Sequence, residues 1–363
     1  MAYGGGGMDS EASRGSGIRI AVIGGGTGLS AMLRGLKLCT ENITAIVTTA
    51  DDGGGSGVLR QDMGIIPPGD IRNCILALAN TEPAMEKLLD YRFTDGRLAG
   101  QSFGNLFLAA LYGLSGSFDQ AILHLSDVLA VAGRVLPVSC QPTSLEAVFE
   151  NGTHVFGESS ISEFKKKQKC RIKQIKLHPQ QPEANRDVLS AIEGADLIVL
   201  GPGSLYTSII PNLLVDGIVD AMNNANALRI YLCNIMTQEG ETEGYTCFDH
   251  ARELARHANN RNLFDICIVN STPVPKECIP RYAEENASPP LLDREMFISE
   301  GIDIRECPLL QIKNGKIRHH PIRLALALFS LFCEISPRDE VCRQADERLL
   351  LWLKEQIEQE ERV

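Results

Sequence analysis

Apolar residues along this chain fall into short continuous runs separated by glycine-rich loops and amphipathic segments. The run IRIAVIG at 18–24 is rich in β-branched residues and stops at glycine, and ITAIVTT at 43–49 repeats this pattern. Between them, apolar residues recur at helical spacing from Leu29 to Leu36. A buried strand, a glycine loop, a helix and a second buried strand make a right-handed βαβ unit. The pattern therefore predicts that an α/β fold begins here.

The middle of the chain has a different periodicity. After four helical segments, apolar and polar residues alternate over 134–139, 144–161 and 170–179, and an Asn-Gly pair stands at 151–152. Alternation with a turn of this type predicts antiparallel strands joined as a hairpin. We expect all three stretches to lie in this antiparallel insertion.

Parallel α/β spacing then returns. Apolar runs at 196–203, 229–234 and 264–270 predict further buried strands, and Asn314-Gly315 predicts the bend of another hairpin. Two apolar helices are expected to follow, at 321–334 and about 340–357. The fold class predicted from this pattern is α/β: a mostly parallel sheet flanked by helices, with a small antiparallel hairpin insertion and a C-terminal helical extension.

This pattern predicts three parts of the chain. Residues 1–17 are rich in glycine and serine and are expected to be a disordered tail, and residues 18–322 are expected to form one α/β domain. Residues 323–363 are expected to form C-terminal helices. The apolar stripe of the last helix, from Val341 to Ile357, is predicted to pack on the body of the same chain.

Composition narrows the classes of function. The 363 residues carry 46 acidic and 35 basic side chains, a net charge of −11, which argues against a diffuse nucleic-acid binder. The densest basic run, Lys165 to Lys173, is predicted to be a solvated polar segment. No apolar run is long enough to span a bilayer and no targeting segment is evident, so we expect no membrane span. Eleven cysteines without a C-x-x-C pair indicate a reducing cytoplasm.

Glycine-rich loops carry the candidate chemistry. GGGTGLS at 24–30, DDGGGSG at 51–57, IPPGDIRN at 66–73 and GPGSLYTS at 201–208 each stand near a predicted strand end or helix start. Glycine allows close backbone approach, and a helix start offers free N–H groups and a positive dipole end to phosphate. Four such loops predict a large anionic ligand, a nucleotide or a nucleotide sugar. The first loop lacks the Lys-Ser/Thr pair of a P-loop and could alternatively be a tight turn without a ligand.

Polar side chains beside these loops have both binding and structural interpretations. Asp51 and Asp52 follow a strand end and could hold a metal ion, a ribose hydroxyl or an attacking alcohol, or could simply form a turn. Asp70 is placed as an N-cap or first-turn acid. Asn73 could reach a phosphate or a base, and Asn105 could contact a base or sugar or cap its helix. No serine stands in a nucleophile elbow.

Seven blocks together resemble a known family. IAVIGGGTGLSAMLRGLK, TAIVTTADDGGGSGVLR, IPPGDIRNCILAL, GQSFGNLFLAAL, RVLPVS, ADLIVLGPGSLYTSIIPNLLV and YLCNIMTQEGETEGYTCFDH look like those of the bacterial gluconeogenesis factor family. This family is the bacterial branch of the group typified by 2-phospho-L-lactate transferase. The resemblance covers about residues 18–322 and implies a cytoplasmic, Rossmann-like protein that binds a UDP-N-acetylglucosamine-type ligand. It also implies a role in cell shape and cell-wall synthesis during gluconeogenic growth.

The same resemblance implies which residues bind the ligand. The expected ligand-binding residues are Gly24, Gly25, Gly26, Thr27, Gly28, Asp51, Asp52, Asp70, Asn73, Asn105, Gly201, Gly203, Ser204, Tyr206, Thr207, Tyr282 and Arg318. An aromatic ring can stack on uracil and a guanidinium can clamp a diphosphate. A cell-wall-synthesis protein is the implied partner, and we expect a homo-oligomer.

Three departures from the family pattern bear on catalysis. Gly55 replaces a usual serine, Val58 a usual basic residue and Gln101 a usual histidine. The favoured hypothesis is therefore a nucleotide-sugar sensor with no catalytic residue and no certain cofactor. The alternative is a phospholactate-type transferase that joins a nucleotide-activated group to an alcohol such as a deazaflavin, with Mg²⁺ on Asp51 or Asp52.

Overall fold

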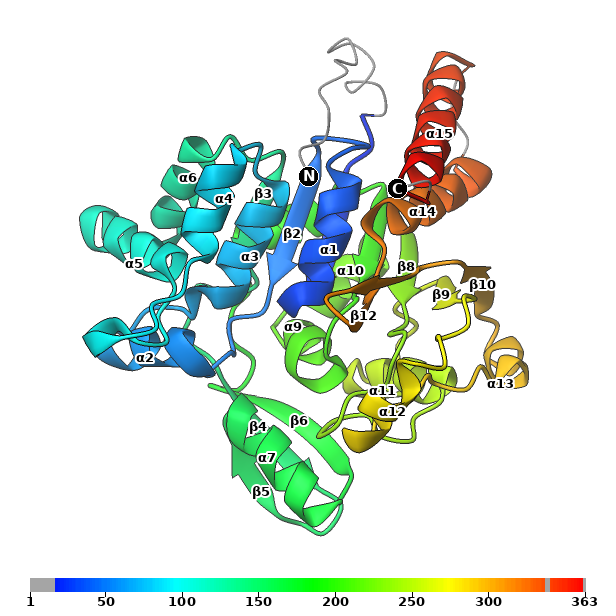
Figure 1. Ribbon diagram of the computed structural model, residues 1–363. Helices are drawn as coiled ribbons and strands as arrows, with labels where there is room; N and C mark the ends of the chain where they lie inside the picture. The colour runs from blue at the N-terminus through cyan, green and yellow to red at the C-terminus, as the bar shows by residue number, and fades with distance from the viewer. Residues whose placement is uncertain (1–16, 337–339, 362–363) are drawn as a thin grey trace.

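A parallel sheet forms the centre of the molecule in the computed structural model, which describes residues 17–336 and 340–361. Its strands are β1 (Ile20–Gly24), β2 (Ile43–Val47), β3 (Arg134–Pro137), β7 (Leu197–Leu200), β8 (Leu228–Leu232), β9 (Ile266–Asn270) and β10 (Asp303–Cys307). All neighbours pair in parallel, in the order β10-β9-β8-β7-β1-β2-β3 (Figure 1). The predicted Rossmann-like α/β fold is confirmed.

Strand order reverses between β1 and β7. From β1 the chain proceeds to β2 and β3 on one side, and later from β7 to β8, β9 and β10 on the other. Every residue of β1, β2 and β7 is buried, as expected of central parallel strands covered on both faces. In open α/β sheets, ligands bind outside the carboxyl ends of the strands at such a reversal. The glycine loops after β1 and β7 therefore meet at the place where this fold class binds ligands.

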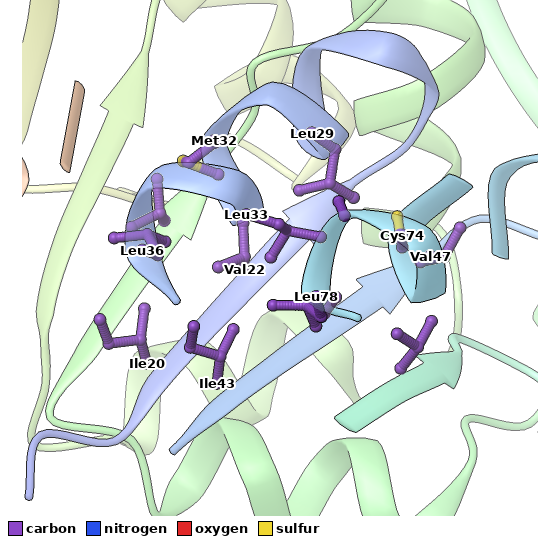
Figure 2. Packing of buried hydrophobic residues seen from close by; sticks show 14 of the residues in the cluster. Ile20, Val22, Leu29, Met32, Leu33, Leu36, Ile43, Val47, Cys74 and Leu78 are labelled. Atoms are coloured by element: carbon purple, nitrogen blue, oxygen red, sulfur yellow. The ribbon is translucent and has the colours of Figure 1, made fainter. Parts of the chain in front are cut away.

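Helices cover both faces of the sheet. One face carries α1 (Gly26–Leu36), α3 (Pro68–Leu78) and α14 (Pro321–Ile335), and Figure 2 shows Leu29 and Leu33 of α1 lying between Val22 of β1 and Cys74 of α3. The other face carries α8 (Arg186–Glu193), α9 (Ile210–Leu213), α10 (Ile218–Asn224) and α11 (Cys247–His257). The buried cysteines act as small core residues, as the sequence indicates.

Further helices lie toward the two edges of the sheet. On the β3 side these are α2 (Gly54–Met63), α4 (Pro83–Asp90), α5 (Phe103–Ser115) and α6 (Phe118–Val128). On the β10 side they are α12 (Ile279–Glu284) and α13 (Arg294–Ser299). Among the described residues, no helix is both long and apolar enough to cross a membrane.

The antiparallel insertion lies apart from the main sheet, at the bottom of Figure 1. It consists of β4 (Ser144–Phe149), β5 (His154–Phe156), α7 (Glu158–Gln168) and β6 (Ile172–His178), with β4 between β5 and β6. The hairpin turn predicted at Asn151-Gly152 is confirmed. The basic run is only partly solvated, because Lys165 is buried in an ion pair with Glu243.

One strand prediction in this region is wrong. Residues 134–139 do not join the antiparallel hairpin, because β3 pairs in parallel with β2 at the edge of the main sheet. Burial alternates along β3 because successive side chains of a strand point to opposite faces of the sheet, which are not covered equally here. Pro137 fits there because an edge strand can spare one N–H group. The opposite edge strand, β10, was not predicted, since its charged residues hide the apolar pattern.

The C-terminal hairpin and helices follow the prediction closely. Strands β11 (Leu310–Lys313) and β12 (Lys316–His319) are antiparallel, and both turn residues have positive φ, +52° at Asn314 and +68° at Gly315. Helix α15 (Glu340–Glu361) packs on α14 through buried Leu349 and Leu353. The expected tail lies almost wholly outside the described residues, and the division at residue 322 stays a prediction.

Candidate functional site

A cleft of about 570 Å³ opens at the reversal point between β1 and β7. Its residues come from the start of α1, the loops after β7 and β8, helix α12 and strand β12. The lining includes Gly25, Gly26, Thr27, Gly28, Gly203, Ser204, Ser208, Asn234, Thr237, Gln238, Glu239, Tyr282, Arg318 and His319, and Lys166 reaches it from α7. The cleft is large enough for a nucleotide-sized ligand.

The glycines at the start of α1 are there for close approach and for backbone conformation. A Cβ on Gly25 would lie 2.7 Å from Asp70 Oδ2, and a Cβ on Gly28 would lie 2.9 Å from the carbonyl oxygen of Pro202. Gly26 has room for a Cβ but adopts φ +71°, which L side chains rarely do. By position, the N–H groups of Thr27 and Gly28 have no partner within the helix. They are the donors that this helix start can offer to an anion.

Asp70 interacts with this helix start directly. It lies in the first turn of α3, as predicted, and its Oδ2 accepts a hydrogen bond of 2.7 Å from the N–H of Gly26. Burial, with a smaller contribution from Asp51, raises the pKa of Asp70 to about 6. Asp70 thus satisfies the first N–H group of α1 and ties α3 to the edge of the cleft.

In the loop after β7, several polar groups form hydrogen bonds within the protein. The N–H of Tyr206 donates to Glu241 Oε2 at 3.1 Å, and Thr207 Oγ1 donates to Glu241 Oε1 at 2.9 Å. Ser204 Oγ donates to Gln238 Oε1 at 2.7 Å. The side chains of Tyr206 and Thr207 are buried, and the Tyr206 hydroxyl pairs with that of Tyr245. Gly203 and Ser204 line the cleft, while Tyr206 and Thr207 lie behind it.

Glu241 is a fully buried carboxylate at the N-terminus of the π-helical turn Leu205–Ile209. Burial raises its pKa to about 7 although three groups donate to it, the third being Gln238 Nε2 at 3.3 Å. The protein therefore places its own carboxyl group at a helix start that the sequence pattern assigned to a ligand phosphate.

Tyr282 and Arg318 form the opposite side of the cleft. The hydroxyl of Tyr282 accepts a hydrogen bond of 2.8 Å from the N–H of Ile317, and Arg281 Nη1 donates to the carbonyl oxygen of Gly315 at 3.1 Å. These bonds join α12 to the β11–β12 hairpin. Tyr282 lines the cleft with its hydroxyl engaged in the bond from Ile317.

Arg318 is half-buried, and its Nη1 donates to the carbonyl oxygen of Ile317 at 3.0 Å. Within residues 17–336 and 340–361, no carboxylate forms an ion pair with it. The neighbouring His319 is buried, and burial lowers its pKa to about 4, so its ring is neutral at pH 7. Arg318 is thus a guanidinium with capacity for an anionic ligand.

The loop after β8 supplies lining residues that sequence reasoning did not assign. Asn234 Nδ2 donates to the carbonyl oxygen of Gly203 at 2.8 Å, which joins this loop to the one after β7. Glu239 forms an ion pair with Lys166 at 3.0 Å and accepts from Asn286 Nδ2 at 3.3 Å. The sequence did contain a signal for these residues, namely a polar segment directly after a predicted parallel strand. Ligands in this fold class bind at the carboxyl ends of the strands near the reversal point.

Carboxylates gather beside the cleft, near the end of β2. Burial and the charge of Asp51 raise the pKa of Glu158 well above its ordinary value, and Glu241 and Asp70 raise it further. Asp51 Oδ1 accepts from the N–H of Gly53 at 2.8 Å. In the described ranges, no group of three His, Cys, Asp or Glu side chains is arranged to hold a metal ion. Asp51 and Asp70 are neighbouring carboxylates, and the charge of Asp51 contributes to the raised pKa of Asp70.

Three further predicted residues make structural contacts outside the cleft. Asp52 Oδ1 accepts from Ser159 N–H and Oγ at 3.0 and 3.1 Å, and so caps the first turn of α7. The side-chain oxygen of Asn73 accepts from Arg72. Asn105 is buried in the first turn of α5, its Nδ2 donating to Ser56 Oγ at 3.4 Å.

Of the predicted binding residues, the structure therefore brings together eight around the cleft: Gly25, Gly26, Thr27, Gly28, Gly203, Ser204, Tyr282 and Arg318. Nine lie behind or beside it: Gly24, Asp51, Asp52, Asp70, Asn73, Asn105, Gly201, Tyr206 and Thr207. Gly201 has φ +81°, and a Cβ there would lie 3.1 Å from the carbonyl oxygen of Leu232. Its role is therefore structural: it allows a backbone conformation and a close packing that a side chain would disturb.

An open parallel sheet with a polar cleft at its reversal point and a glycine-rich helix start beside it defines a Rossmann-like ligand-binding protein. Residues 20–310 match the family model of 2-phospho-L-lactate transferase CofD. The chain therefore belongs to this transferase family, in the branch whose members are named gluconeogenesis factors.

Similar proteins extend over most of the chain. A putative gluconeogenesis factor of Thermoanaerobacterium thermosulfurigenes is 54% identical over 316 residues, which cover 87% of this chain and 97% of that protein. The gluconeogenesis factor of Bacillus subtilis is 44% identical, covering 87% and 98%. A crystal structure of a UPF0052 family protein from Bacillus halodurans is 42% identical with a TM-score of 0.81, covering 86% and 99%. The resemblance inferred from the sequence blocks is confirmed.

Proposed function

We propose that this protein is a regulatory protein that binds a nucleotide sugar, a uridine-diphosphate N-acetylhexosamine, and reports its level to cell-wall synthesis during gluconeogenic growth. The names of its relatives support the link to gluconeogenesis. The eleven cysteines, among which no C-x-x-C pair occurs, support a cytoplasmic location. A cell-wall-synthesis protein as partner and a homo-oligomeric state belong to the same proposal.

The observation that carries the proposal is a cleft with backbone N–H donors on one side and a guanidinium and an aromatic ring on the other. On one side the first turn of α1 presents the N–H groups of Thr27 and Gly28, which suit a phosphate. On the other, Arg318 offers a guanidinium that no described carboxylate neutralises, and Tyr282 offers a ring to stack on a base. A diphosphate between these sides would gain donors from both.

The loop after β8 suits the sugar. Asn234, Gln238 and Glu239 present amide and carboxylate groups to the cleft, which match the hydroxyl and acetamido groups of an N-acetylhexosamine. Lys166 of α7 closes this end through its ion pair with Glu239. The antiparallel insertion would thereby contribute one residue to the ligand site.

A thermal-shift screen of nucleotides and nucleotide sugars, with and without magnesium, tests the proposal. At a hundredfold excess over Kd, a ligand that binds only the native state stabilises it by about 2.7 kcal/mol, which moves the melting midpoint by several degrees. We expect UDP-N-acetylglucosamine to produce this shift. A shift with guanosine nucleotides and none with uridine nucleotide sugars would contradict the proposal.

A phospholactate-type transferase is the second candidate, favoured by the carboxylates beside the cleft. The donor set fits magnesium if substrate phosphates complete the coordination, since Mg²⁺ is commonly held by one or two carboxylates plus phosphates. Asp51 and Asp70 would hold it, because Asp52 is engaged at the start of α7. Bound there, the ion would neutralise diphosphate charge.

Two departures from the family pattern favour the regulatory function, and they are sterically linked. A Cβ on Gly55 would lie 2.8 Å from Gln101 Oε1 and 3.1 Å from the carbonyl oxygen of Gly100. The usual serine would therefore crowd Gln101 in its present position. Glutamine cannot accept a proton at neutral pH as histidine can. We propose that the combination of Gly55 and Gln101 has removed acid–base chemistry from this part of the protein.

Nucleotide release decides between the candidates. Protein, magnesium, a deazaflavin alcohol and a nucleotide-activated phospholactate are mixed, and free nucleotide is followed by chromatography. We expect no release above the protein-free control. Protein-dependent release that disappears in Asp51→Asn would establish the transferase instead.

A further inference from the structure

The last turn of α15 contacts the segment that follows Arg318. Glu360 Oε2 lies 2.9 Å from His320 Nε2, and Glu361 forms an ion pair with Arg323. His320 is the N-cap residue of α14 and directly follows β12, the strand that carries Arg318 into the cleft. The C-terminal helix therefore ends beside the backbone that positions a candidate ligand contact (Figure 1).

The hydrogen bonds of His320 explain how this contact works without a formal charge on the ring. Its Nδ1 accepts from the N–H of Arg323 at 3.4 Å, so Nε2 carries the proton and donates to Glu360. Burial lowers the pKa of His320, which favours this neutral form. Its backbone N–H donates to the carbonyl oxygen of Leu309 at 2.7 Å and closes the hairpin. His320 thus links the hairpin, α14 and α15.

The start of α14 is held tightly from the α1 side. A Cβ on Gly35 would lie only 2.1 Å from the carbonyl oxygen of Pro321, so the two backbones touch. Helix α1 begins at the glycines of the cleft. The junction that carries Arg318 therefore lies between α1, which is fixed by the core, and the last turn of α15.

The charge pattern of α15 makes sense only in this docked position. Its final two turns contain Glu355, Glu358, Glu360 and Glu361, and up to residue 361, where the described part ends, its last turn has no basic residue. Acidic residues at a helix C-terminus oppose the helix dipole, whereas the N-terminus of α14 favours them. The contacts with His320 and Arg323 at the start of α14 thus offset the unfavourable interaction of these acidic residues with the dipole of their own helix.

We propose that Glu360 and Glu361 are positioning residues for the nucleotide-sugar site: they fix the start of α14, and through it the cleft position of Arg318, so that docking of α15 sets ligand affinity. This rests on the proposed function for its ligand. Because both pairs are partly exposed, each contributes modestly. Undocking the last turn would lower the fraction of protein whose cleft is competent to bind.

The test compares Glu360→Gln/Glu361→Gln with the matched control Glu347→Gln/Glu355→Gln on the same helix. Both control residues are exposed. In titration calorimetry with UDP-N-acetylglucosamine, we expect the first variant to bind about threefold more weakly and the control to bind like wild type. The melting midpoint without ligand should match the control. Equal affinity of the two variants would overturn the proposal.

Hydrogen exchange without ligand separates this proposal from the proposed function. The amides of Ile317 and His319 should exchange faster in Glu360→Gln/Glu361→Gln than in the control, because the hairpin loses its support. Unchanged exchange would overturn the positioning role. If wild type fails to bind the nucleotide sugar, the proposed function fails, while the exchange result still decides whether α15 positions β12.

Discussion

Glu241 provides the sharpest test of the structure, because a fully buried carboxylate with a raised pKa makes stability depend on pH. Its pKa is about 7 in the folded protein, against an ordinary value of 4.5. Between these values the folded state binds more protons than the unfolded state. The free energy of unfolding from this group therefore falls as pH rises from about 4.5 to about 7.

The expected size follows from the shift. A pKa difference of one unit corresponds to about 1.36 kcal/mol, so integrating the two titration curves from pH 5 to pH 8 gives a loss of about 2.5 kcal/mol. Glu241→Gln removes this titration. The free energy of unfolding of the variant, relative to wild type, should rise by about 2.5 kcal/mol over the same interval.

Urea denaturation of wild type and Glu241→Gln at pH 5, 6, 7 and 8 measures this difference. Asp70 also titrates, but it does so in both proteins and largely cancels in the subtraction. Glu158 cancels only in part, because the charge of Glu241 contributes to its raised pKa. Glu355→Gln, which changes an exposed carboxylate, is the control and should give a flat difference. A flat difference for Glu241→Gln would refute the burial and bonding of this carboxylate.

Three further predictions concern the cleft and need titration calorimetry and thermal melts. Arg318→Ala should weaken nucleotide-sugar binding by about 1.5–3 kcal/mol with little change in ligand-free stability, and wild-type affinity would remove Arg318 from the site. Gly28→Ala places a Cβ against the carbonyl oxygen of Pro202, so it should destabilise the fold by about 1–3 kcal/mol and reduce binding; an unchanged melting midpoint would contradict this packing. Tyr282→Phe loses the bond from Ile317 but keeps the ring, so affinity should fall by about 1 kcal/mol, and a loss as large as that of Tyr282→Ala would make the hydroxyl the main contact.

The pattern of apolar residues was sufficient to predict those strands of the sheet that are mostly buried. The buried strands β1, β2, β7, β8 and β9 were predicted from apolar runs, and both Asn-Gly turns from their residues, because central strands and tight turns each impose a local sequence requirement. The edges failed. Strand β3 was assigned to the wrong sheet and β10 was missed, since an edge strand needs fewer apolar residues and its partner is set by distant chain segments.

The site was predictable only in part, for a related reason. Glycine-rich loops at predicted strand ends indicate a ligand site, and six of the eight predicted residues around the cleft lie in such loops. Tyr282 and Arg318 were expected only from the family resemblance. The sequence does not indicate which polar groups bind each other across elements. Asp52 is engaged by Ser159, more than one hundred positions away, and Asn234 and Gln238 come from a loop to which sequence reasoning assigned no residue. Only the folded arrangement separates capping residues from ligand contacts.

Many hydrogen-bond donors of the glycine loops already bind acceptors of the protein itself, and this limits where an anion can bind. The loop after β7 gives its donors to Glu241 and Gln238, and the first N–H of α1 is taken by Asp70. What remains is the second and third N–H groups of α1, at Thr27 and Gly28, facing a cleft whose other side carries Arg318. A diphosphate that binds here must also be compatible with the nearby carboxylate of Asp70, so one helix start alone would bind it weakly. The guanidinium of Arg318 is the charge that makes such a site favourable, and this is why the segment from β12 to α15, which positions Arg318, is where we expect affinity to be set.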